Sequence, residues 1–350
     1  MSLIRHPLLV LLCLVLFLTA PLARAASDEN KATDSNEGYS ELKPRPGSLP
    51  RGPGFGSLGT LGFMPSATTV LTYGGWIAPQ KSPTEIDQHR LTLQVPIYRD
   101  DAEVISLSAG ASSLHFGEAQ ALSGSNILVP QDLWKIEFGG GYMKKLEDDK
   151  MVGGRLSLGS ASDHPFASFN VTTIGASAFY SWKTSEASRW ILSVLFSNNN
   201  PILNYVPIPG VIYMYQTPKF TGMFGFPFSS ILWSFAENWT YSFSFFGPTI
   251  NSEVAYGNPR EVQVFTGFNW LQQSYLREAR PDPKERLYFD EKHASLGVRF
   301  PLVKGVRSDL QGGYAFDRSL YEGQGFRKKD DGEKNLDASW YAAWNFKIDL

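Results

Sequence analysis

The stretch WYAAWNFKIDL, residues 340–350, decides the fold. From Trp340 onward every second residue is apolar, whereas the residues between them include Asn345, Lys347 and Asp349. Successive side chains of a β-strand point to opposite faces, so the stretch predicts a strand with one apolar face and one polar face. A strand of a membrane β-barrel has this character, because lipid covers one face and a polar lumen the other.

The apolar positions of this stretch also resemble the C-terminal signal of bacterial outer-membrane barrels. That signal normally ends in Phe or Trp, whereas this sequence ends in Leu. We therefore expect the last strand to be the contact with the barrel-assembly machinery, through an assembly signal made of Trp344, Phe346, Ile348 and Leu350.

The first 25 residues have the organisation of a secretory signal peptide. Arg5 precedes the apolar run 8–18, and the tripeptide ARA at 23–25 offers a small-residue cleavage site. The alternative is a membrane anchor, for which the run is shorter than the ~20 residues of a spanning helix. The single cysteine, Cys13, lies in this segment, so the mature chain would have no disulfide and no cysteine nucleophile or metal ligand.

Residues 26–65 have a different composition from the rest of the chain. They are polar at first and then rich in Gly and Pro, including the run PGFGSLG at 53–59. Such a segment cannot bury a hydrophobic core, so we predict a disordered linker. The functional alternative is a plug or a periplasmic tether.

The charge of the chain excludes a class of partner. Charged residues make up 19% of the sequence and the formal net charge is −2. Removal of the two arginines in 1–25 leaves 30 basic against 34 acidic residues, a net charge of −4. This balance lacks the basic surface that nucleic-acid binding requires, so we expect no nucleic acid partner.

From residue 66 onward, segments with alternating hydrophobicity recur between turn-like segments. Outer-membrane barrels have short periplasmic turns and long external loops. The predicted connections here alternate in the same way, the short ones including 99–103, 146–150, 184–188 and 303–305, and the long ones 79–88, 115–133, 199–209, 276–287 and 321–335. We predict an all-β fold, a transmembrane antiparallel up-and-down β-barrel over residues 66–350, with an even strand number of about 12–16.

The range in the predicted strand number arises from the middle of the chain. The segments 210–215, 220–226 and 229–235 are shorter than the roughly 9–11 residues of a tilted spanning strand. They either extend past their prolines or fail to span. Aromatic residues near the predicted strand ends, such as Tyr98 and Trp190, favour interfacial girdles over the core of a soluble β protein.

Three stretches resemble a family of bacterial outer-membrane barrel proteins of unassigned function. They read PIPGVIYMYQTPKF at 207–220, GFPFSSILWSFAENWTYSFSF at 225–245 and GYAFDRSLYEGQGF at 313–326. The resemblance implies a barrel fold and an outer-membrane location, with lipid as its surroundings. It supplies no substrate and no catalytic residue.

Charged residues with the inward parity are the candidate functional set. They carry both signs, which supports either a pore whose charges tune selectivity or a lumen closed by salt bridges. The candidate lumen-lining residues are Arg90, Lys135, Glu137, Arg155, Glu261, Arg299, Arg307, Asp309, Asp317 and Lys347.

No catalytic, metal or cofactor site stands out in the sequence. Asp163 next to His164 and Asp290 near His293 could be acid–base pairs, but no residue is marked as a nucleophile. No two histidines have the spacing of metal ligands. We expect no enzyme activity, no cofactor and no metal.

Three functions remain open at this point. The first is a passive channel for small solutes in the outer membrane, which follows from polar inward side chains. The second is a closed structural or adhesive barrel that acts through external loops, such as the charged segment 322–335. The third and most remote is an outer-membrane hydrolase.

Overall fold

The computed structural model describes residues 69–77, 85–123, 128–200, 203, 205–326, 329 and 332–349 of the 350-residue chain. The predicted signal peptide and linker, 1–25 and 26–65, lie outside this part and remain predictions. No helix in the described residues is long and apolar enough to cross a membrane.

Nineteen strands and one short 3-10 helix make up the described structure. In chain order they are β1 (Val70–Ile77), β2 (Ile86–Arg99), β3 (Glu103–Phe116), β4 (Gln120–Ala121), β5 (Leu128–Val129), β6 (Asp132–Lys145), β7 (Met151–Ser162), η2 (Phe169–Val171), β8 (Thr172–Ser185), β9 (Ser188–Ser197), β10 (Ile208–Gln216), β11 (Phe220–Phe226), β12 (Phe228–Ala236), β13 (Trp239–Phe246), β14 (Thr249–Gly257), β15 (Gln263–Tyr275), β16 (Arg286–Val303), β17 (Val306–Gly323), β18 (Glu333–Leu336) and β19 (Ser339–Asp349).

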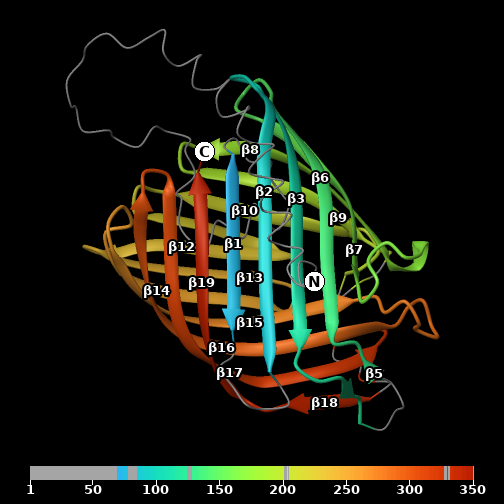
Figure 1. Ribbon diagram of the computed structural model, residues 1–350. Coiled ribbons are helices and arrows are strands. Elements are labelled where there is room, and N and C mark those ends of the chain that lie inside the picture. Colours follow the sequence, from blue (N-terminus) through green and yellow to red (C-terminus); the bar gives the residue numbers. More distant parts are fainter. Residues whose placement is uncertain are drawn as a thin grey trace. The chain divides into compact units, whose positions relative to one another are not determined.

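The strands form a closed antiparallel barrel, as predicted. β1 pairs with both β2 and β19, which joins the first strand to the last (Figure 1). The sheet has 17 strands, but β18 and β19 both pair with β17 and continue one another along it. They count as one, which gives a sixteen-stranded barrel, the upper limit of the prediction. The small hairpin β4–β5 stands apart from the wall.

The middle segments are full members of the wall. β10 and β12 have 9 residues each and β11 has 7, and each pairs with both of its neighbours. Strand β10 extends past Pro209 at one end, which resolves one ambiguity of the sequence.

The two ends of the barrel differ in their connections. At one end, called the short-turn end, the connections are 100–102, 146–150, 186–187, 217–219, 237–238, 258–262 and 304–305. The other end, called the long-loop end, includes 117–131, 163–171, 198–207 and 276–285. The predicted alternation is therefore observed, except that β11–β12 and β13–β14 are joined tightly at the long-loop end.

The outer face of the barrel is an exposed apolar belt. Soluble monomers seldom expose contiguous apolar surface of this kind. Leu156 and Leu296, from strands β7 and β16, are 70% and 63% exposed. Members of the belt come from strands all around the wall, among them Leu107, Phe138, Leu158, Val194, Val211, Phe224, Val264, Leu310 and Trp344.

Exposed aromatic side chains form a band near the short-turn end of the outer face. Rings from neighbouring strands touch, with centroid distances of 5.0 Å for both Trp190–Tyr213 and Trp239–Tyr256. Tyr288, an aromatic residue that also lies near a strand end, is fully buried and is not part of this band. In β19, Trp344 is exposed and Tyr341 buried, as the alternation predicts; Leu350 lies outside the described residues.

One side of the barrel interior is filled. Inward side chains of β8 to β12 form a buried apolar cluster of Phe179, Ile191, Ile212, Met214, Met223 and Phe228. Strand β10 carries apolar side chains on both faces, Ile212 and Met214 inside and Val211 outside, which weakens its alternation in the sequence. Open space is left on the other side, along β1–β3, β14–β17 and β19.

Candidate functional site in the lumen

A cavity of about 410 Å³ lies against strands β1–β3, β14–β17 and β19. Contacts across the lumen identify the inward parity of its walls. The Gln88 amide on β2 donates to Glu291 on β16 at 2.5 Å, and the Gln273 amide on β15 donates to Gln88 at 3.1 Å. Arg90 has the same parity as Gln88, so its side chain projects into the lumen, where it is exposed.

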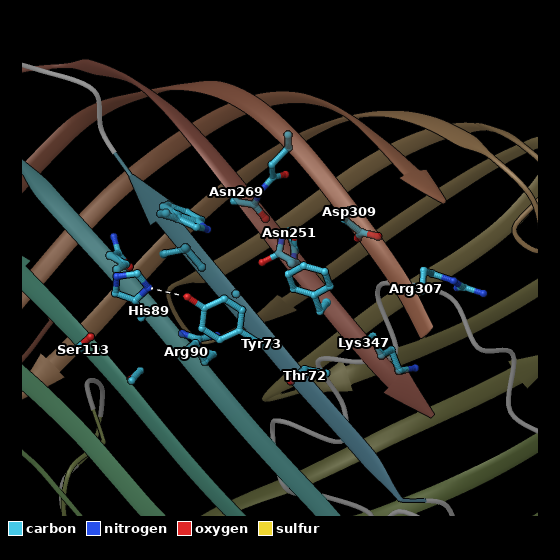
Figure 2. A pocket seen from close by; sticks show the side chains of 18 of the residues that line it. Thr72, Tyr73, His89, Arg90, Ser113, Asn251, Asn269, Arg307, Asp309 and Lys347 are labelled. Atoms are coloured by element: carbon cyan, nitrogen blue, oxygen red, sulfur yellow. Dashed lines mark hydrogen bonds between the residues drawn. The ribbon is translucent and has the colours of Figure 1, made fainter. Parts of the chain in front are cut away.

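Two adjacent glycines lie in the wall of β1 beside the cavity, and the first of them, Gly74, lines it. Gly74 and Gly75 leave β1 without side chains on either face at this point. A Cβ on Gly75 would lie 3.0 Å from the Tyr73 hydroxyl and 3.2 Å from His89 Nδ1. Those two groups are hydrogen-bonded at 3.0 Å and belong to the lining (Figure 2).

Five of the ten predicted lumen residues line this cavity: Arg90, Arg299, Arg307, Asp309 and Lys347. Some of these charged side chains have an ion-pair partner and others do not. Arg299 is buried and binds Asp309 at 3.0 Å and Glu253 at 3.2 Å. Lys347 lies 3.4 Å from Asp349. Arg90 and Arg307 have no ion-pair partner among the residues that the structure describes, so they leave positive charge free in the cavity.

Three further predicted residues lie on β6 and β7, away from the cavity lining. Arg155 donates to Glu137 at 2.8 Å, and Lys135 is exposed two residues along the same face. This pair neutralises itself, so its contribution to the field in the lumen is small.

The structure corrects the expected places of Asp317 and Glu261. A β-bulge between Asp290 and Lys292 changes the register with β17, and Asp317 has a positive φ of 49°. The bulge turns Asp317 to the outer face, where it binds Lys292, while Arg318 points inward. Glu261 is not on a strand at all, because β15 begins at Gln263.

The long-loop end of the lumen is closed by an apolar layer. Twelve side chains form it, and ten of them are 2% exposed or less. They come from the strand ends nearest the long loops and from the connection 117–131. The members are Ile86, Leu114, Phe116, Leu122, Val129, Leu133, Ala161, Tyr275, Leu287, Phe289, Leu320 and Leu336. The loop side chains Leu122 and Val129 pack inside the barrel.

The connection 276–285 lies over this layer and is bound on two sides. Arg277 makes two hydrogen bonds to Glu322 on β17, at 3.0 and 2.6 Å, and the Glu322 side chain is fully buried. Across the barrel, the Leu276 N–H donates to the Ala161 carbonyl at 2.7 Å. We call this connection with its Arg277–Glu322 pair the latch.

Asp163 holds the far side of the latch. The Glu278 N–H donates to its carboxylate at 2.9 Å, and the Ser162 hydroxyl donates at 2.8 Å. Burial acts to raise the pKa of Asp163, but these donors and His164 outweigh it and hold the pKa below its ordinary value. The carboxylate therefore stays charged and keeps accepting these bonds at neutral pH.

A buried polar network lies between the apolar layer and the cavity. Glu291, 1% exposed, is 3.1 Å from His293 Nε2 and 3.5 Å from Arg318 Nε. Trp76 packs against His293, with centroids 4.3 Å apart. The partner of His293 is thus Glu291 rather than the expected Asp290, whose carboxylate accepts from the Trp270 indole at 2.6 Å.

Sequence reasoning missed Gln88, Glu291 and the amides of the cavity. Asn251, Asn269 and Asn345 line it, yet uncharged polar residues were not in the predicted set. Their inward parity was readable, since Asn345 alternates with Trp344 and Phe346. The network at Glu291 had no local signal, because it depends on contacts across the lumen.

Fold and site thus define a closed barrel with an apolar outer belt and a polar internal cavity. The sequence matches no protein-family model and no curated protein. Solved structures with some similarity include a COG4313 outer membrane channel from Pseudomonas putida F1, with 9% identity, TM-score 0.35 and coverage of 83% of this chain and 97% of that one. Another is the toluene transporter TodX of Pseudomonas putida, with 9% identity, TM-score 0.34 and coverage of 81% and 90%. Values this low assign no family, so the resemblance seen in 207–245 and 313–326 stays a prediction.

Proposed function

We propose that this chain is a bacterial outer-membrane channel that passes small polar solutes through its lumen. The observation that carries the proposal is the polar cavity inside a barrel whose outer face is an apolar belt. Lipid on the outside and a hydrated lumen inside is the arrangement of a membrane barrel. The latch and the apolar layer close the long-loop end, so passage requires that they move.

Single-channel recording tests this proposal. The mature chain is refolded, its folding is checked by heat-modifiable migration, and current is measured across a planar bilayer. We expect discrete, reproducible current steps separated by long closed periods, because the closed arrangement is well packed. A folded protein that never conducts would contradict the channel.

A second candidate is a closed structural or adhesive barrel. The apolar layer favours it, because twelve packed side chains fill the long-loop end as the core of a soluble domain would. This reading predicts a silent bilayer together with a function that is lost when an external connection is deleted. We propose no catalytic role, since His293 is fully buried under Trp76 and Tyr341.

If lipid surrounds the barrel, a charged substitution in the outer apolar belt should destabilise it. Leu156, in the middle of β7, is 70% exposed. We expect Leu156→Arg to destabilise the barrel in lipid vesicles by about 2–4 kcal/mol, because the charge would lie in hydrocarbon. The measurement is the free energy of unfolding in urea, followed by tryptophan fluorescence.

Leu128 provides the matched control for that substitution. It lies in the hairpin β4–β5 of connection 117–131 and is 65% exposed, similar to Leu156. Leu128→Arg should change the free energy of unfolding by no more than about 0.5 kcal/mol, as surface substitutions in water do. Equal small effects at both positions would mean that no lipid covers the belt.

A further inference from the structure

We propose that the lumen cavity binds small hydroxylated carboxylates, and that such acids are the solutes of the channel. The inference rests on the proposed channel function, because it names the solute class. It is carried by cationic side chains on β17, β19 and β2, which with β1 form four adjacent strands, and by amide side chains on β14, β15 and β17.

Strand register sets these side chains in two neighbouring rows. In one row, Arg307 is opposite Lys347, Lys347 opposite Thr72, and Thr72 opposite Thr92. Like charges directly opposite across strands repel, and among the described residues Lys347 has only Asp349, at 3.4 Å, as an ion-pair partner. A carboxylate seated against Arg307 and Lys347 would relieve this repulsion.

The next row, two residues along each strand, runs from Asp309 through Asn345 and Gly74 to Arg90. Gly74 has no side chain, and the Asn345 amide lies over it, since a Cβ on Gly74 would be 2.5 Å from Asn345 Oδ1. Guanidinium groups bind carboxylates through paired, charge-assisted hydrogen bonds. Arg90, Lys347 and Arg307 all line the cavity, and Figure 2 shows Arg90 on one side of Tyr73, with Lys347 and Arg307 on the other side.

Amide side chains complete the lining of the cavity. Asn251 and Asn269 on β14 and β15, and Gln311 on β17, make no side-chain hydrogen bond to another described residue, yet all line the cavity. An amide offers both a donor and an acceptor, which matches the hydroxyl groups of a polyol. The volume, about 410 Å³, is within the usual range of small-molecule sites, roughly 300–1,000 Å³.

Calorimetric titration of the folded mature protein in detergent tests the inference. The probes are gluconate, a hydroxylated carboxylate, and sorbitol, a neutral polyol of the same chain length. We expect saturable binding of gluconate and no binding of sorbitol. Arg90→Gln and Arg307→Gln should each weaken gluconate binding by at least about tenfold, since each removes a charge-assisted contact. Heat-modifiable migration confirms that each variant is folded.

Arg260→Gln is the matched control, because Arg260 is exposed in the turn between β14 and β15, outside the cavity lining. It should leave gluconate binding unchanged. Absence of gluconate binding, equal binding of sorbitol, or unchanged affinity in Arg90→Gln and Arg307→Gln would each overturn the site. Conductance without gluconate binding would remove the site and keep the channel, whereas binding with a silent bilayer would keep the site and remove the channel.

Discussion

Replacement of Glu291 by Leu is expected to lower the free energy of unfolding by about 3–5 kcal/mol. Glu291 is 1% exposed, and among the described residues it is the ion-pair partner of the buried Arg318, at 3.5 Å; it also lies 3.1 Å from the buried His293. Its loss leaves the Arg318 guanidinium in the interior without a counter-charge. Urea unfolding of the refolded barrel, followed by tryptophan fluorescence, measures the change.

Two further variants separate charge from volume. In Glu137→Leu the same substitution breaks a salt bridge to Arg155, but the Glu137 side chain is 32% exposed, so the cost should not exceed about 1 kcal/mol. In the double variant Glu291→Leu with Arg318→Met no charge is left unpaired, and much of the lost stability should return. The explanation fails if Glu291→Leu costs no more than Glu137→Leu.

Local alternation was enough to predict the wall of the barrel. Trp340 and Trp344 are exposed on the outer face, at 65% and 48%, while Tyr341 and Ala343 are buried inside. The face to which a side chain points follows from its position within its own strand, so it can be predicted from neighbouring residues once the sheet is known to close into a barrel. The same reasoning placed Arg90, Arg299, Arg307, Asp309 and Lys347 on the face that the cavity occupies.

The alternation gave the wrong face where a β-bulge adds one residue to strand β17. The bulge opposite Glu291 reverses the faces of Asp317 and Arg318. The flanking residues, Phe316 and Ser319, include no glycine that would have indicated a bulge in the sequence. Glu261 was misplaced for a simpler reason, because its segment ends in a turn before β15 begins. A single-residue shift moves every later side chain to the other face.

The closed long-loop end was beyond sequence reasoning. Leu122 and Val129 belong to a connection, yet they are 1% exposed inside the barrel. Their burial depends on Leu287, Leu320 and other side chains distant in sequence. Alternation assigns residues to faces of a strand, but it carries no information on which loop turns back into the lumen.

Replacement of Arg277 by Met in the latch is expected to raise the open fraction of the channel strongly. Arg277→Met removes both hydrogen bonds to the fully buried Glu322 carboxylate and leaves its charge unpaired in the closed barrel. Opening the connection 276–285 would hydrate Glu322, so the substitution should favour the open state. A penalty of about 3–5 kcal/mol for an unpaired buried charge corresponds to roughly a hundredfold or greater rise in the open-to-closed ratio. The measurement is the open fraction in single-channel records.

Lys292→Met is the control for the latch, because it breaks the ion pair with Asp317 on the outer face, where Asp317 is 67% exposed. It should leave the open fraction unchanged. The double variant Arg277→Met with Glu322→Met removes the unpaired charge, so its records should return toward those of the wild type. If Arg277→Met gates like the wild type, the connection 276–285 does not control access to the cavity, and solutes must enter by a route that leaves the Arg277–Glu322 pair intact.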